Sequence, residues 1–341
     1  MAERRTLAHM RERLPLLIGL ILAAISAGCG SSAPTAARAD GHVYWLTNED
    51  GGKLKRVPIG GGPVTTLARN LKGPNALAVD STHVYWTSPT AGTVSMVPID
   101  GGDVTTLATG RANYSIAVDG AHVYWTDLGR FRFGSYMDGT VKEAPLSGGH
   151  MTILASGQPS PESIAVNGTH VYWTTWKDVY RAGVSGTVNT VPVDGGTVTT
   201  LANGLVDSVA TDGKHVCWLD SDSGTVNAAP ADGGKLTVLA TDQFYARSVA
   251  VDGTHVYWIS YYGYPYDGTV REVPVGGGKV TTLATGLNFP DAIAAAGTHV
   301  FWANHGDPHR LDGSIQEIPL GGGKVTTLAS HQHPVALAVG P

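Results

Sequence analysis

The apolar residues of this chain stand in short runs separated by polar, glycine-containing turns. In one stretch these runs cover residues 115–118, 122–125, 139–144 and 151–154. Gly120 lies between the first and second runs, and the pair Gly148-Gly149 lies between the third and fourth. Short apolar runs bounded by such turns predict β-strands, and glycines with positive φ angles form tight hairpins. We therefore expect four antiparallel strands, which we call a, b, c and d in chain order.

The same stretch recurs seven times. Run b reads His-Val-Tyr-Trp in five copies and His-Val-Cys-Trp or His-Val-Phe-Trp in the other two; the copies begin at His42, His83, His122, His170, His215, His255 and His299. Successive copies are 39 to 48 residues apart. A repeat of this length is one supersecondary unit that can bury its apolar face only against a neighbouring unit, as in propellers and solenoids. Because the histidines recur in every copy, we expect them to be structural.

The two ends of the chain complement each other. The first copy, at His42, has no run a before it, whereas residues 336–339 form a run a with no copy after it. A closed ring needs such ends and a solenoid does not, since closure pairs the last strand with the first unit and removes an exposed edge. We predict an all-β fold for residues 41–341: a seven-bladed β-propeller of four-stranded antiparallel blades, closed by the C-terminal strand joining the first blade.

One copy carries the motif Tyr124-Trp125-Thr126-Asp127, followed by Asp-Gly-Thr-Val at 138–141 and Pro-Leu-Ser-Gly-Gly at 145–149. This copy resembles the YWTD repeat of low-density-lipoprotein-receptor-type propellers, and the chain is similar to bacterial exported propellers of unassigned function. The other copies depart from the four-residue motif, and seven copies are countable where the receptors have six. The resemblance implies a propeller architecture and no particular chemistry.

The first 28 residues have the features of an export signal. An apolar stretch of 12 residues, 14–25, follows a segment with four arginines and precedes three small residues and Cys29. The stretch is shorter than the ~20 apolar residues that span a bilayer, and small residues before a cysteine resemble a bacterial lipobox. We predict a lipoprotein signal peptide, residues 1–28, cleaved before a lipidated Cys29, and a flexible tether, residues 29–40.

Two cellular locations follow from two ways of processing this segment. Lipidation of Cys29 predicts a protein of the bacterial cell envelope, at the outer membrane or cell surface, whose only membrane contact is the N-terminal lipid. Ordinary cleavage after Ala39, in the Ala-Arg-Ala sequence at 37–39, predicts a periplasmic or secreted protein instead. Cys217 is the only other cysteine, so a lipidated Cys29 leaves no disulfide within one chain.

Composition and charge narrow the function classes. Only 15% of the residues are charged and 45 of 341 are glycine, which excludes a disordered or coiled-coil chain. The net charge is −5, from 23 basic and 28 acidic residues, and Lys and Arg form no cluster that could follow a phosphate backbone. We therefore expect no nucleic-acid partner, and we expect a monomer.

The two faces of the predicted disc differ. The a–b and c–d turns lie on one face and are nearly identical in every copy, whereas the b–c and d–a connections lie on the opposite face. The length variation falls on this second face, in the b–c loops 126–139, 174–186, 259–268 and 303–313. Variable loops on a rigid scaffold commonly carry binding sites.

Half of the aromatic residues gather on the variable face. Of 26 Trp, Tyr and Phe residues, 13 lie outside the repeat motifs, all in b–c or d–a connections: Tyr114, Phe131, Phe133, Tyr136, Trp176, Tyr180, Phe244, Tyr245, Tyr261, Tyr262, Tyr264, Tyr266 and Phe289. Recognition surfaces favour such side chains because they bury much area at little cost in conformational entropy. The competing interpretation is that some of them only pack the loops together.

These observations predict a surface-anchored, non-enzymatic propeller that binds a carbohydrate or an envelope protein. Trp176, the only Trp outside the motifs, is the first choice for an exposed platform. The predicted ligand-binding residues are Trp176, Tyr180, Tyr136, Phe133, Tyr245, Tyr261, Tyr264 and Arg247.

An alternative function rests on the residues that enter each run a, at the mouth of the central channel. Four of them carry oxygen ligands suited to a hard cation such as Ca²⁺: Asn75, Glu162, Asp207 and Asp291. These residues could serve a metal-dependent hydrolase or lyase, and no other cofactor is expected. The competing interpretation is a solvated polar rim, partly paired with Arg247.

Histidines outside the repeats offer a second possible chemistry. His305, His309, His331 and His333, together with Asp307, lie on connections of the last copy that reach the variable face. Imidazoles beside a carboxylate could bind Zn²⁺ or act as acid and base, or they could simply be solvated loop residues.

Overall fold

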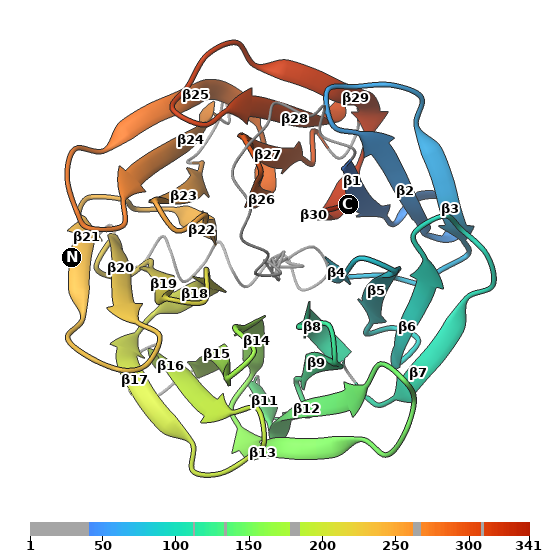
Figure 1. Ribbon diagram of the computed structural model, residues 1–341, viewed down its shortest axis with the longest axis vertical. Coiled ribbons are helices and arrows are strands. Elements are labelled where there is room, and N and C mark those ends of the chain that lie inside the picture. Colours follow the sequence, from blue (N-terminus) through green and yellow to red (C-terminus); the bar gives the residue numbers. More distant parts are fainter. Residues whose placement is uncertain (1–40, 112, 133–134, 178–184, 262–266, 308–309) are drawn as a thin grey trace.

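The computed structural model describes residues 41–341 except 112, 133–134, 178–184, 262–266 and 308–309. Seven four-stranded antiparallel sheets stand around a central axis as a closed ring (Figure 1), which confirms the predicted seven-bladed propeller. Every described strand lies between His42 and Gly340, so residues 41–341 contain the complete ring. Among the described residues, no helix has the length and hydrophobicity needed to cross a membrane.

Each blade is formed by strands a to d, counted outward from the axis. Blade 1 consists of β30 (Pro334–Gly340), β1 (His42–Thr47), β2 (Lys53–Pro58) and β3 (Thr65–Arg69), with the 3-10 helix η1 (Glu49–Gly51) between β1 and β2. Blade 2 consists of β4 (Leu77–Val79), β5 (His83–Ser88), β6 (Thr93–Pro98) and β7 (Thr105–Thr109). Blade 3 consists of β8 (Asn113–Val118), β9 (His122–Asp127), β12 (Gly139–Pro145) and β13 (Thr152–Gln158), with an additional hairpin of β10 (Arg130–Arg132) and β11 (Ser135–Met137). Blade 4 consists of β14 (Pro161–Val166), β15 (His170–Lys177), β16 (Ser185–Pro192) and β17 (Thr199–Gly204).

The remaining three blades follow the same order. Blade 5 consists of β18 (Val206–Thr211), β19 (His215–Asp220), β20 (Thr225–Pro230) and β21 (Thr237–Ala240). Blade 6 consists of β22 (Ala246–Val251), β23 (His255–Ser260), β24 (Asp267–Pro274) and β25 (Thr281–Asn288). Blade 7 consists of β26 (Pro290–Ala296), β27 (His299–Asn304), β28 (Gly313–Pro319) and β29 (Thr326–Gln332).

In blades 2 to 6 the a–b turn is held by a carboxylate or amide at the end of strand a. In blade 2, Asp80 Oδ1 accepts hydrogen bonds from the backbone N–H groups of Thr82 (2.6 Å) and His83 (2.8 Å), and Oδ2 accepts one from the Tyr85 hydroxyl (2.8 Å). Burial works to raise the pKa of Asp80, but these donors lower it overall. The His83 ring lies 2.9 Å from the neighbouring Thr82 hydroxyl and 6.0 Å, between centroids, from the Tyr85 ring, so this motif histidine belongs to the turn and its blade.

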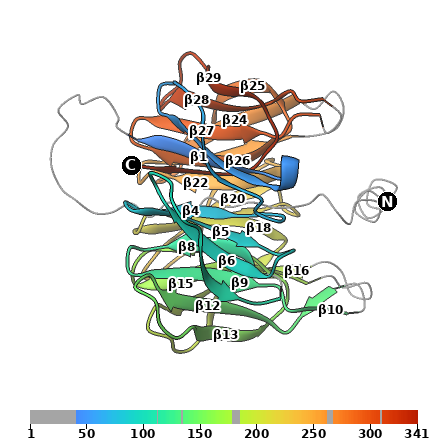
Figure 2. The same ribbon diagram turned by 90° about the vertical axis from the view of Figure 1, so that its right-hand side faces the viewer.

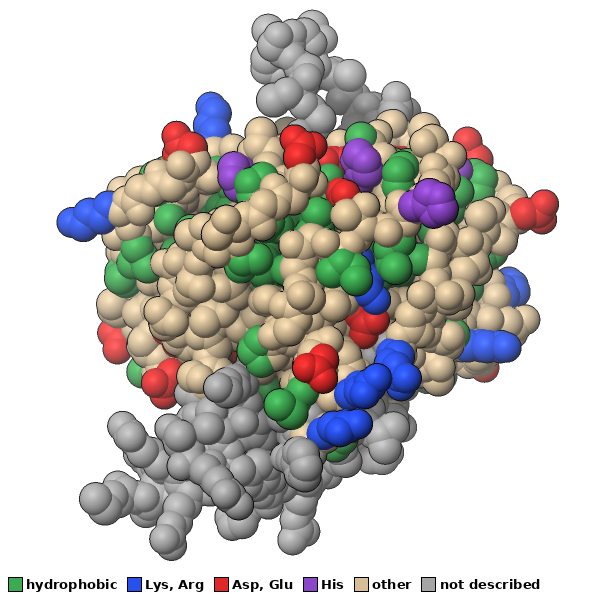
Figure 3. Space-filling view, turned by 90° about the horizontal axis from the view of Figure 1, so that it is seen from below, with side chains coloured by type: hydrophobic (Ala, Val, Ile, Leu, Met, Phe, Trp, Pro, Cys, Tyr) green, Lys and Arg blue, Asp and Glu red, His purple; other side chains and the backbone are tan. Residues whose placement is uncertain are grey.

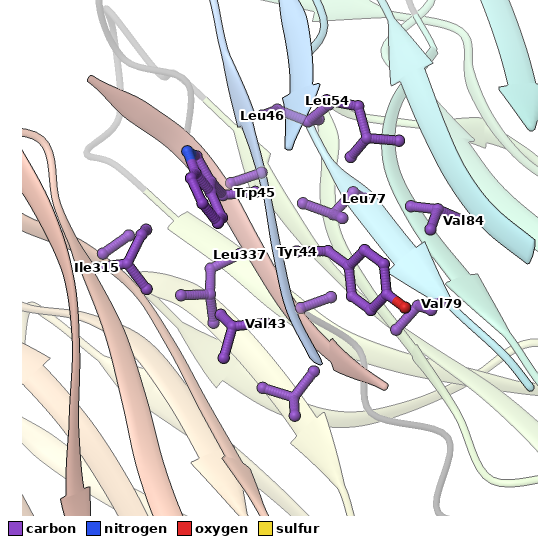
Figure 4. Close-up of a cluster of buried hydrophobic side chains, with 14 of the residues drawn as sticks. Val43, Tyr44, Trp45, Leu46, Leu54, Leu77, Val79, Val84, Ile315 and Leu337 are labelled. Atoms are coloured by element: carbon purple, nitrogen blue, oxygen red, sulfur yellow. The ribbon is translucent and has the colours of Figure 1, made fainter. Parts of the chain in front are cut away.

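The core lies between blades, not within them. The Tyr and Trp of strand b are buried in the intact motifs; around β1, Tyr44 and Trp45 pack with Leu77 of blade 2 and Ile315 of blade 7 (Figure 4). Burying one large apolar side chain contributes roughly 1.5–3 kcal/mol, and here most of that contact comes from a neighbouring blade. A single blade therefore has little core of its own.

The C-terminal strand closes the ring as predicted. β30 pairs antiparallel with β1 from His42 opposite Gly340 to Leu46 opposite Ala336, and the sheet order is β3-β2-β1-β30. Leu337 on this strand is fully buried in the cluster shared with blades 2 and 7. The pairing joins blade 7 to blade 1, and it gives blade 1 the inner strand that the N-terminal part of the chain does not supply.

Leu337→Ala tests how much the closing strand contributes. We expect a loss of about 2–5 kcal/mol in the free energy of unfolding, since removing a fully buried leucine side chain leaves a cavity. Chemical denaturation of both proteins gives the value. The matched control is Leu311→Ala, because Leu311 is 58% exposed. Equal stability of the two variants would contradict a stabilising role for the closing strand.

Candidate functional site

The two sides of the disc are distinct in the structure. Strand b begins at the a–b turn and runs to the b–c connection, so all b–c and d–a connections emerge on one side, which we call the loop face. Figure 2 shows η1 and β10 on this side and the C-terminal end of the chain on the other. Figure 3 views the disc edge-on, with the loop face at its lower edge.

The structure describes five of the eight predicted ligand-binding residues. Tyr180, Phe133 and Tyr264 lie outside the described residues. Trp176 is half-buried: β15 continues through it, and its backbone N–H donates to the Ser160 carbonyl at 3.0 Å. The ring is therefore partly built into blade 4 and is less open than an exposed platform would be. Tyr136 and Tyr245 are also half-buried, on β11 and before β22.

The other two, Arg247 and Tyr261, belong to a cluster on the loop face of blade 6. The Arg247 guanidinium lies over the Tyr261 ring, with Cζ 4.6 Å from the ring centroid. On Tyr261, Phe289 packs edge to face at 5.6 Å between centroids. A guanidinium over an aromatic face is attracted by the ring quadrupole, and an edge-to-face pair is a preferred aromatic geometry. The three side chains therefore fix one another at the entrance to strands a of blades 6 and 7.

Asp291 adds a half-buried carboxyl to this cluster. It lies near the start of β26, in the electrostatic range of Arg247 and His305. Burial raises the pKa of the Asp291 carboxyl, and the positive charges of Arg247 and His305 oppose that rise without cancelling it. Perturbed carboxyls of this kind concentrate at functional sites.

Two histidines extend the cluster toward blade 1. The rings of His305 and His333 are 5.3 Å apart between centroids. His333 Nε2 donates to the Arg310 carbonyl at 2.6 Å, and its Nδ1 lies 3.4 Å from Glu49 Oε1. Protonation of Nδ1 therefore creates an ion pair between the d–a connection after blade 7 and η1 of blade 1.

We call this set of residues the seam site, because it follows the boundaries between blades 6, 7 and 1. Its members are Arg247, Tyr261, Phe289, Asp291, His305, His333 and Glu49. The sequence predicted all of them except Glu49 as candidates, but assigned them to three separate features: the aromatic face, the channel mouth and the loop histidines. Glu49 gives no signal of its own, since it lies in a short b–c turn and meets His333 only through ring closure.

The structure places the predicted cation ligands in different blades. Asn75 precedes β4, Glu162 lies on β14, Asp207 on β18 and Asp291 on β26. In the part of the chain that the structure describes, no three His, Cys, Asp or Glu side chains are grouped closely enough to hold a metal ion. The Ca²⁺ site therefore stays a prediction. Of the four loop histidines, His305 and His333 come together, His331 is exposed, and His309 lies outside the described residues.

Comparisons with known proteins place the fold and leave the activity open. No protein-family model matches the chain, and no curated protein is similar to it in sequence. Among solved structures, it is similar to a chain of the nidogen/laminin complex, with 18% identity, a TM-score of 0.56, and coverage of 88% of this chain and 98% of that one. That complex contains a YWTD-type propeller, so the resemblance read from the repeat is supported at the level of the fold.

Two enzymes have similar structures. Streptogramin B lyase matches with 14% identity and a TM-score of 0.59, over 78% of this chain and 87% of the lyase. A puromycin-hydrolyzing peptidase of Mycobacterium tuberculosis matches with 15% identity and a TM-score of 0.60, over 91% of this chain and 57% of the peptidase. Propellers of this shape thus include binding proteins and enzymes, and the fold alone does not decide between them.

Asp291→Asn tests the electrostatics of the seam site. Because the folded-state pKa of Asp291 is raised, ionisation destabilises the folded protein progressively as pH rises above the unfolded value of about 3.9. The uncharged variant should therefore have the higher free energy of unfolding at neutral pH, and the difference should shrink as the pH approaches 4. Denaturation curves across this range provide the measurement.

The charge-matched control is Asp222→Asn, since Asp222 is exposed on a b–c turn. A variant Asp291→Asn that is less stable than the wild type at neutral pH would mean that the carboxylate supports the fold.

Proposed function

We propose that this protein is a surface-anchored, non-enzymatic propeller that binds a carbohydrate at the seam site. One observation carries the proposal: an aromatic pair, a guanidinium, a carboxyl and two imidazoles are gathered at one point of the loop face. A sugar ring packs its C–H face on an aromatic ring, while its hydroxyls need donors and acceptors at the ring edge. Tyr261 and Phe289 supply the aromatic rings. Arg247, Asp291 and His305 supply the hydrogen-bond donors and acceptors.

The rigidity of the cluster supports binding. Arg247 and Tyr261 are already stacked, and Phe289 is already seated against Tyr261, so a ligand need not order them. Side chains held in place before binding reduce the entropic cost of association. An envelope protein is the other ligand class that this face suits, because aromatic and Arg side chains also dominate protein interfaces.

A second candidate function, a hydrolase or lyase, is favoured by a single observation. Asp291 has a raised pKa and lies near His305, and a carboxyl beside an imidazole can exchange protons with a bound substrate. The binding proposal is preferred because the stacked aromatic and Arg side chains are platforms for recognition rather than reacting groups.

The point where the chain enters the ring favours an anchor that leaves the loop face open. β1 begins at His42, opposite Gly340, on the side of the a–b turns. A tether to a lipid on Cys29 would therefore leave from the side opposite the seam site. The seam site would then face away from the membrane, toward ligands outside.

Arg247→Ala and Tyr261→Ala test the ligand proposal. An immobilised glycan array identifies the sugars that the wild type binds, and calorimetry measures their affinity. We expect each variant to weaken that affinity by at least about tenfold, as loss of a central interface residue does. The control is Lys235→Ala, which removes a positive charge on the opposite face. Identical array profiles for all four proteins, or a blank array, would refute carbohydrate binding at the seam site.

Cys29→Ser tests the anchor. In the native host, we expect the wild type in the membrane fraction, labelled by a radioactive fatty acid, and the variant in the soluble fraction without label. Ala39→Asp is the companion variant, because it blocks only the alternative cleavage and should leave the labelling unchanged. A Cys29→Ser protein that remains membrane-bound would overturn the lipoprotein interpretation.

A further inference from the structure

The hairpin of β10 and β11 stands apart from the seven blades. It forms a separate two-stranded sheet within the b–c connection of blade 3, with Arg130 opposite Met137, Phe131 opposite Tyr136 and Arg132 opposite Ser135. In Figure 2, β10 projects from the loop face. No other described b–c connection contains a sheet of its own. The ring does not need this hairpin for closure, so its residues are available for another role.

The base of the hairpin is fixed to blade 3 by a buried ion pair. Asp127 Oδ2 lies 2.8 Å from Lys142 Nζ, with both side chains about nine-tenths buried, and Asp127 Oδ1 accepts the N–H of Gly129 at 3.0 Å. Gly129 has a φ of +82° and leaves no space for a Cβ against Met137 and Gly139. Burial works to raise the pKa of Asp127, but Lys142 and the Gly129 N–H lower it overall.

The ion pair occurs in the one repeat that has the complete motif. Asp127 is the last residue of the only intact Tyr-Trp-Thr-Asp sequence, and it is in the repeat that carries the hairpin. Burying the charges of Asp127 and Lys142 costs desolvation energy. Among the described residues, the other six blades form without such an ion pair, so the fold of a blade does not require it. The ion pair does fix the direction in which the hairpin leaves the disc.

The exposed side chains of the hairpin alternate between cationic and apolar. Arg130 and Arg132 are exposed on one strand, with Phe131 between them 64% exposed and Met137 on the partner strand 47% exposed. Phe131 packs edge to face on Tyr136, at 5.1 Å between centroids, which keeps the Phe131 ring in place. Neither arginine forms an ion pair with a described residue.

From these contacts we propose that the β10–β11 hairpin binds an anionic polysaccharide. The whole chain has a net charge of −5, yet a group of Lys and Arg side chains gathers at the loop-face edge in Figure 3. Arg130 and Arg132 share one face of β10, so their two guanidinium groups can bind carboxylate or sulfate groups on successive sugars. Phe131 faces the other side of the strand, where it packs on Tyr136 and holds the hairpin together. The binding site comprises Arg130 and Arg132.

The dimensions of the hairpin favour a linear polymer over the other anionic partners. A stable protein interface buries about 800 Å² on each partner, from roughly 20–30 residues, whereas the described hairpin strands have three residues each. With the lipid anchor proposed at Cys29, the membrane would lie on the opposite side of the disc, where the chain enters the ring at His42, and this disfavours a lipid surface as the partner of the hairpin. This site lies in blade 3, across the loop face from the seam site, and does not rest on the function proposed for the seam site.

Binding of polygalacturonate, a linear polymer of carboxylated sugars, to residues 41–341 tests the proposal. We expect saturable binding by calorimetry that weakens as salt is raised from about 50 mM to about 500 mM, because salt screens exposed charges. Arg130→Ala with Arg132→Ala should weaken binding at least about tenfold. Arg130→Lys with Arg132→Lys should retain part of the affinity, since the charge remains but the bidentate fork is lost.

Matched controls separate this site from general charge and from the seam site. Lys214→Ala with Lys235→Ala removes two exposed positive charges from the opposite side and should bind like the wild type, as should Arg247→Ala. The hairpin and lysine variants should unfold like the wild type, because their substituted side chains lie in the hairpin or in turns, outside the blades. Equal binding by the double arginine variant, equal binding of neutral dextran, or binding only to vesicles of phosphatidylglycerol would overturn the proposal.

Discussion

The packing of each blade against its neighbours is the interaction on which the rest of this structure depends. A blade exposes an apolar sheet face on both sides, and the tryptophans and tyrosines of strand b are buried only when another blade covers them. An open row of seven blades would leave two such faces in water. Closure by β30 against β1 removes both at once, so the stability of every blade depends on the pairing of strands from the two ends of the chain.

The two faces of the closed ring differ in how much their loops can vary. The a–b turns of blades 2 to 6 repeat the same geometry, held by an Asp carboxylate or, in blade 4, by the Asn167 amide. Little variation is possible there without loss of the hydrogen bonds that these side chains accept. The opposite ends of the strands are free to carry insertions. The seam site uses this freedom where blades 6, 7 and 1 meet, and the Arg-rich hairpin uses it at blade 3.

The sequence was sufficient to predict the ring, because seven copies and complementary ends leave few arrangements. It was less informative about individual side chains. Trp176 was expected to be exposed, but strand b of blade 4 continues to Lys177, and nothing in the repeat pattern marks this extension. The pairing of His333 with Glu49 joins residues from the two ends of the chain, so it depends on how the last blade meets the first. Arg and Phe alternate at 130–132, which is typical of a β-strand, but these residues were predicted to belong to a b–c loop.

The position of β1 has a mechanical consequence. β1 lies between β2 and β30, and it is the strand through which residue 41 connects to the ring. A force that pulls residue 41 away from the disc acts along β1 and strains its hydrogen bonds to both neighbours in shear. Bonds strained in shear must break together, whereas bonds at a peeled edge break one after another. A propeller held by this end should therefore resist stretching forces well, even though its ring is closed only by hydrogen bonds and apolar packing.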